Sequence, residues 1–140
     1  MVSQSKLRFG KELDKLKIDD IQLLIDNKID ESHNLEYKGA TTNTQSDCDN
    51  IAVAISSFLN TDGGIVLYGV SETKGSKPKY PNGFSWSNAS KEQIESLLVS
   101  RVHPWSERIR IHRIKKKNSA TQGIFIIEVP KSASPLHMNN

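Results

Sequence analysis

The sequence predicts one α/β domain, more specifically an α+β domain, in which about three helices pack on a mixed sheet. A chain of 140 residues, 36% hydrophobic and 25% charged, has the size and composition of one domain with one modest core. Two apolar runs of strand length, residues 65–70 and 124–129, predict central strands. Three further segments carry apolar residues at helical spacing.

The first half of the chain predicts a helix, a strand and a second helix. Asp19, with Gln22 three residues later, is the expected N-cap of the first helix. A short strand is expected over residues 34–38 and a polar loop over 39–47. The second helix follows from helically spaced apolar residues, namely Ile51, Ala54, Ile55, Phe58 and Leu59.

The second half predicts a third helix and a hairpin. Residues 71–87 form a loop rich in Gly and Pro, from which Phe84 and Trp86 are expected to fold back onto the core. Ser90 caps the third helix. A half-buried strand over 108–111 precedes Ile114, which breaks the alternation and indicates a bulge. We expect one shared core formed by Ile55, Phe58, Ile65, Leu67, Leu97, Ile124 and Ile126.

The same patterns predict how the chain is organised. Residues 1–16 are expected to be a flexible segment, 17–137 the domain, and 138–140 a tail or a truncation point. No apolar stretch reaches the roughly 18 residues of a membrane span, and the N-terminus lacks a secretory signal, so we expect a cytoplasmic protein that does not contact membranes. Cys48 is the single cysteine, which excludes an internal disulfide and any multi-cysteine zinc site.

Charge is distributed unevenly along the chain. Residues 11–50 contain ten acidic and five basic residues, a local charge of −5, whereas residues 101–117 contain seven basic residues and one acidic residue, a local charge of +6. Both runs are equally compatible with solvated faces. If the basic run binds nucleic-acid phosphates, its ligands are Arg108, Arg110, His112, Arg113, Lys115, Lys116 and Lys117.

Three carboxylates and one lysine are candidate catalytic residues. Glu36 and Lys38 alternate past Tyr37 and so point to one side of the first strand, with Glu31 just before it. Glu72 follows the central strand, where sites in open α/β sheets gather. Several carboxylates suit Mg²⁺ or Mn²⁺. The alternative is that these acids are solvated or salt-bridged.

Several motifs in order resemble the Schlafen AlbA-type domain. Residues 31–38, Glu-Ser-His-Asn-Leu-Glu-Tyr-Lys, are similar to its opening, and residues 57–64, Ser-Phe-Leu-Asn-Thr-Asp-Gly-Gly, to its next landmark. The strand ending in Gly69-Val70, the helix ending at Pro104, and residues 127–132, Ile-Glu-Val-Pro-Lys-Ser, follow in the same order. The likeness spans about residues 17–137.

The resemblance implies a compact, Schlafen-like lobe and a nucleic-acid partner. In the ribonuclease Schlafens, three acidic residues make a cation-dependent cut in structured RNA such as tRNA. Glu31 and Glu36 keep the separation of the first two acids, and the third role passes to Glu72, although Ser71 is the residue directly after the Gly-Val strand end. Relatives that are ATP-binding or DNA-binding parts of transcriptional regulators imply the alternative, a binding module without catalysis. Because ribonuclease Schlafens pair two such lobes, the resemblance also implies a homodimer.

Overall fold

The computed structural model describes residues 3–72, 84–85, 89–117, 119, 121–133 and 138–139. The described helices are α1 (Gln4–Phe9), the 3₁₀ turn η1 (Leu13–Lys15), α2 (Ile18–Asp26), α3 (Thr44–Leu59) and α4 (Lys91–Val99). The described strands are β1 (Leu35–Lys38), β2 (Gly64–Tyr68), β3 (Phe84–Ser85), β4 (Val102–His103), β5 (Arg110–Lys115), β6 (Gln122–Val129) and β7 (Met138–Asn139). The α+β class predicted from the sequence is confirmed.

The main sheet is mixed. β1 runs parallel to β2, with Leu35 opposite Ile65. β2 is antiparallel to β6, and β6 is antiparallel to both β5 and the short β3. β4 and β7 form a separate two-stranded pair. This order leaves β1 at one edge of the main sheet, where a backbone N–H can take a side-chain partner in place of a neighbouring strand.

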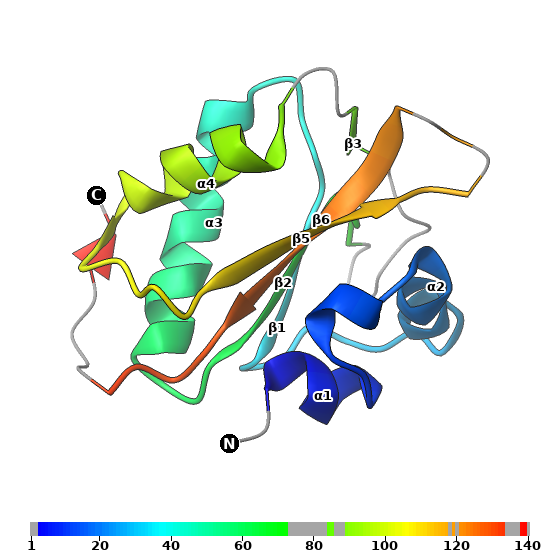
Figure 1. Cartoon of the computed structure of the whole chain (residues 1–140), viewed down its shortest axis with the longest axis horizontal. Helices are drawn as coiled ribbons and strands as arrows, with labels where there is room; N and C mark the ends of the chain where they lie inside the picture. The colour runs from blue at the N-terminus through cyan, green and yellow to red at the C-terminus, as the bar shows by residue number, and fades with distance from the viewer. Residues whose placement is uncertain are drawn as a thin grey trace.

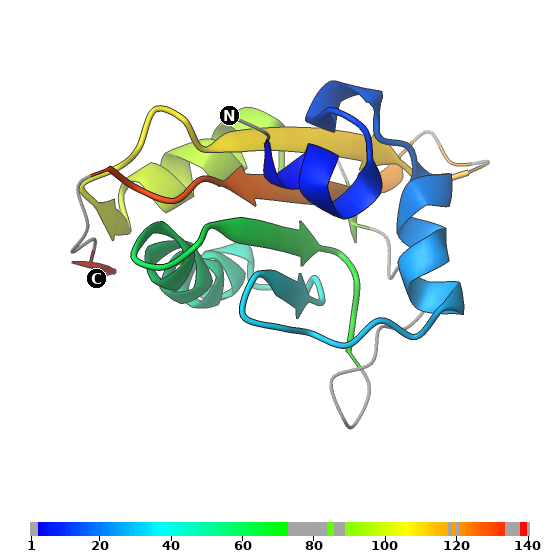
Figure 2. The ribbon, with the colours of Figure 1, turned by 90° about the horizontal axis from the view of Figure 1, so that it is seen from below.

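Helices cover both faces of the sheet (Figures 1 and 2). α3 and α4 lie on one face, and α1, η1 and α2 lie on the other. Every residue of β2 is buried, because alternate side chains of a central strand enter the two cores in turn.

Burial is confirmed for six of the seven predicted core residues, but the expectation of one shared core is wrong. Ile55 and Phe58 belong to the cluster under α3 and α4. Ile65, Leu67, Ile124 and Ile126 belong to the cluster under α2 and η1, and Leu97 is partly buried. The reason is the pleat: residues of one strand that are two apart share a face, and the sheet separates them from the helices on its other side.

Two helices begin earlier than predicted. Lys17, not Asp19, is the N-cap of α2, and its N–H donates to the Asp20 carboxylate at 2.9 Å. Asn43 caps α3 by accepting from the Ser46 N–H at 2.9 Å, so the polar loop ends there instead of at residue 47. The predicted Ser90 cap of α4 is confirmed, with Gln93 completing a capping box.

The bulge expected at Ile114 is absent from the described strand pairing. The register runs unbroken from Arg110 opposite Glu128 to Lys115 opposite Gly123. Ile111 and Ile114 are both buried because they lie on opposite faces of β5, each in a different core. A strand covered on both faces explains the broken alternation without an extra residue.

The N-terminal residues contact the sheet. Ser5 is buried, its N–H donates to the Glu128 carboxylate at 3.0 Å, and Leu13 and Leu16 belong to the second core. The division into a flexible segment and a domain starting at residue 17 stays a prediction. The expected return of Phe84 and Trp86 to the core lies outside the described side chains. No helix in the described part is long and apolar enough to cross a membrane.

Candidate functional site

The Glu31 carboxylate is fixed at the free edge of β1. It accepts a hydrogen bond from the Tyr37 N–H at 2.9 Å, and Tyr37 is the third residue of that strand. The Tyr37 ring points the other way, into the second core, where its hydroxyl donates to the Ile29 carbonyl at 2.6 Å. A residue upstream of the strand is thereby brought beside the strand itself.

Glu31 and Glu72 form a carboxyl pair. Close contact with the Glu31 carboxyl, burial and the charge of Glu31 together raise the pKa of Glu72 to about 7, against a smaller opposing effect of Lys38. Contact between two carboxyl groups favours a proton on one of them. The structure therefore brings together two of the three predicted acids, and Glu72 is the one whose pKa lies near neutral pH.

Glu36 and Lys38 lie in the same groove as Glu72. They line a cavity of about 400 Å³ together with Asn50 and Val53, which come from α3. The pairing of β1 with β2 explains this, because Glu36 and Lys38 oppose Val66 and Tyr68, both of which face α3. The predicted alternation of Glu36 and Lys38 onto one side is confirmed.

A buried carboxylate ties together the segments that carry these groups. Asp47, 1% exposed, accepts from the Tyr68 hydroxyl at 2.6 Å and from the Thr41 N–H and hydroxyl at 2.9 and 2.7 Å. Tyr68 ends β2 shortly before Glu72, and Thr41 follows β1 shortly after Lys38. The Gly69 N–H also donates to the Lys38 carbonyl at 2.7 Å, so the ends of both strands are held in place.

The predicted basic residues do not share one surface. Arg110 and His112 oppose Glu128 and Ile126 on the face that carries α1 and α2, whereas Arg113 and Lys115 oppose Phe125 and Gly123 on the other face. Burial lowers the pKa of His112, which favours the uncharged form of its ring. Lys117 pairs with Asp19 at 2.7 Å. The phosphate-binding role of this set stays a prediction.

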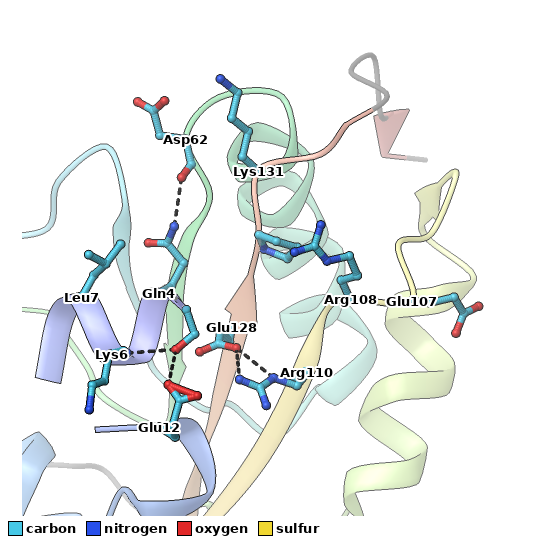
Figure 3. Close-up of a pocket in the computed structure, with 12 residues that line it drawn as sticks. Gln4, Lys6, Leu7, Glu12, Asp62, Glu107, Arg108, Arg110, Glu128 and Lys131 are labelled. Atoms are coloured by element: carbon cyan, nitrogen blue, oxygen red, sulfur yellow. Dashed lines mark hydrogen bonds and ion pairs between the residues drawn. The ribbon is translucent and has the colours of Figure 1, made fainter. Parts of the chain in front are cut away.

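A second and larger hollow lies beside α1 (Figure 3). It measures about 670 Å³, and its lining includes Arg108 and Arg110 of the predicted basic set, together with Lys6 and Lys131. At its floor, the Arg110 guanidinium donates two hydrogen bonds to one oxygen of Glu128, from Nε at 2.9 Å and from a terminal nitrogen at 2.6 Å. This ion pair and the Ser5 N–H hold the pKa of Glu128 below its usual range although burial opposes them.

Comparison with known families decides the relationship. The sequence profile described as Schlafen, AlbA_2 matches residues 31–140. The chain belongs to the Schlafen AlbA_2 family. No curated protein matches it.

Membership in the Schlafen AlbA_2 family gives the chain a function related to nucleic acid. The match begins at Glu31, the first residue of the carboxyl pair, and includes all four candidate catalytic residues. The family resemblance stated from the motifs is confirmed.

The donor set of the Schlafen AlbA_2 groove partly fits a divalent cation. Two carboxyl groups that share a proton form a hard oxygen site once that proton leaves, and Glu36 lines the groove with one of them. Among the residues that the structure describes, no three His, Cys, Asp or Glu side chains are grouped as a metal site. Glu31 and Glu72 are therefore the residues that would hold the ion, and a ligand role for Glu36 stays a prediction.

Sequence reasoning missed three features of this Schlafen AlbA_2 domain. Asp47 stands in a stretch that the sequence assigns to a polar loop, and nothing there indicated its bond to Tyr68. The position of Asn50 in the groove was missed because its helix was predicted from the apolar residues alone. Lys131 is the single basic residue of the segment after β6, and that segment was interpreted only as a family landmark.

Proposed function

We propose that this domain is an endoribonuclease that depends on a divalent cation, Mg²⁺ or Mn²⁺, and cuts structured RNA such as tRNA. The observation that carries the proposal is the close contact between the Glu31 and Glu72 carboxyl groups. Two acids in contact repel each other once both are ionised, and such pairs with raised pKa values gather at functional sites. Family membership supports nucleic acid as the substrate.

A cation held by the two carboxylates would lower the pKa of a bound water and neutralise charge on the scissile phosphate. The bond from the Tyr37 N–H holds one oxygen of the Glu31 carboxylate, so the other oxygen would remain for the ion. Lys38 lines the same groove as Glu72, where its ammonium group stabilises negative charge that develops on the phosphate. Glu36 lies on the same wall and would complete the set of acids.

The second candidate is a nucleic-acid or nucleotide-binding module without cleavage, as part of a larger regulator that binds DNA, RNA or ATP. It is favoured by the 670 Å³ hollow, where four cationic side chains lie apart from the carboxyl pair. Binding there requires neither a metal ion nor Lys38. The homodimer implied by the resemblance is compatible with either candidate.

The test is cleavage of end-labelled tRNA with and without Mn²⁺. We expect fragments only with the cation, and none from Glu31→Gln or Glu72→Gln. Glu95→Gln is the matched control, because Glu95 is an exposed acid on α4 outside the groove. Cleavage by both pair variants at the parent rate would exclude the carboxyl pair, and an intact tRNA with the parent protein would favour the binding module.

A further inference from the structure

The large hollow beside α1 lies at the end of the sheet away from the carboxyl pair. Asp62, on its rim, precedes β2, whereas Glu72 follows that strand. Its volume of about 670 Å³ falls within the roughly 300–1,000 Å³ of ligand sites. The proposed cleavage uses none of its lining residues, so the hollow requires a separate explanation.

One wall of the hollow carries three cations from two neighbouring strands. Arg110 begins β5, Arg108 precedes it, and Lys131 follows the end of β6. Figure 3 shows Arg110, Arg108 and Lys131 following one another along the same side, opposite α1. Arg110 keeps 49% of its side chain exposed although it is paired, so its guanidinium can still reach a ligand.

The acidic residues that line the hollow do not neutralise the positive charge of this wall. Glu128 is 5% exposed and accepts from both Arg110 and the Ser5 N–H, so its charge is already compensated. The Glu107 side chain points away from the other labelled residues (Figure 3). Glu12 accepts from the Ser3 hydroxyl on the opposite side, and Asp62 lies at the rim near α1. Positive charge is therefore concentrated on the wall formed by β5 and β6.

We propose that this wall binds successive backbone phosphates of a nucleic-acid strand. A row of three cations along one wall matches the row of phosphates that a nucleic-acid strand presents. The hollow also offers apolar surface to a ribose or a base, since Leu7 is 67% exposed and Pro130 lines the same space. This site goes beyond the proposed cleavage, because binding here needs neither the carboxyl pair nor a cation.

The experiment measures anisotropy of a labelled single-stranded RNA of about 12 nucleotides, with EDTA present, over a series of salt concentrations. The test variant carries Arg108→Gln and Lys131→Gln. Arg110 is left in place, because its removal would leave the buried Glu128 unpaired and destabilise the fold. Lys15→Gln with Lys28→Gln removes the same charge from two exposed positions that do not line the hollow and serves as the control.

If the wall binds phosphates, the double variant should lower the slope of log K against log salt by about 1.4, or about 0.7 for each lost contact with a single strand. An unchanged slope in a variant with the parent circular dichroism spectrum would overturn the proposal, as would a parent protein that binds no RNA. Millimolar ATP that displaces the RNA completely would also overturn it, because the occupant would then be a mononucleotide. Glu72→Gln should bind with the parent slope, so a failure of cleavage and a failure of this site remain distinguishable.

Discussion

The buried contact between Tyr68 and Asp47 gives a quantitative test of what holds the groove together. Tyr68→Phe removes a hydroxyl that donates to a carboxylate at 2.6 Å, with both residues buried. Hydrogen bonds to charged groups contribute about 1.5–3 kcal/mol, compared with about 0.5–1.5 kcal/mol for neutral ones. Asp47 retains both bonds from Thr41, so we expect a loss of about 2 kcal/mol in the free energy of unfolding.

Tyr37→Phe is the matched control. The Tyr37 hydroxyl also donates at 2.6 Å from a buried ring, but to a neutral carbonyl, that of Ile29. Its loss should cost about 1 kcal/mol. Urea denaturation of both variants at pH 7 measures the difference between the two losses in free energy of unfolding. In thermal unfolding, Tyr68→Phe should lower the Tm by about 6–8 °C. A larger loss for Tyr37→Phe than for Tyr68→Phe would refute the reasoning that the Asp47 charge strengthens this contact.

Three further predictions concern the carboxyl pair, a turn and the assembly. Because the fold raises the pKa of Glu72 to about 7 from 4.5, its protonated form is favoured, and the parent should lose stability as pH rises from about 5 to 8. The full shift corresponds to about 3.4 kcal/mol, which solvent screening of this exposed side chain reduces to about 1 kcal/mol. In urea titrations with EDTA, Glu72→Gln should abolish this loss of stability at higher pH. A variant with the pH profile of the parent would contradict the contact between Glu31 and Glu72. Gly63→Ala should cost more stability than Gly10→Ala in the same assay, although both glycines have positive φ (78° and 74°). A Cβ at Gly63 would lie 2.7 Å from the Val129 carbonyl oxygen, whereas a Cβ at Gly10 would meet no described residue within 4 Å beyond its own neighbours along the chain. Equal losses would count against this close approach. Light scattering at high micromolar concentration with RNA should give the mass of a homodimer, and a monomer mass would exclude it.

Local sequence patterns were sufficient for most of the secondary structure. The Ser90 cap lies within a few residues of its partner, and the apolar run of β2 is long enough to indicate a buried strand without knowledge of its neighbours. Features of this kind depend on short-range hydrogen bonds and side-chain period, which the sequence displays directly.

Contacts between segments far apart in the sequence could not be predicted from local patterns. The assignment of Ile111 and Ile114 to two different cores depends on helices that cover both faces of β5, which a broken alternation alone does not indicate. Arg110 and Lys115 were expected on one surface, but their opposite parity along β5 turns them to different faces.

The candidate site contains features that local sequence patterns predicted and features that depend on long-range contacts. The side shared by Glu36 and Lys38 followed from strand geometry. The contact between Glu31 and Glu72 depends on the edge position of β1 and on where the chain goes after β2, neither of which is local. The bond of Asp47 to Tyr68 spans 21 residues and left no pattern in the sequence.

Calorimetric titration of Mn²⁺ into the parent protein at pH 6.5 tests the central claim most directly, namely that Glu31 and Glu72 form one cation site. In two buffers of different ionisation enthalpy, the heats should reveal release of part of a proton, because the ion displaces the one that the pair shares. Glu72→Gln should lose the binding, and Glu95→Gln should retain it. Absence of Mn²⁺ binding by the parent, or equal binding by Glu72→Gln, would contradict the account.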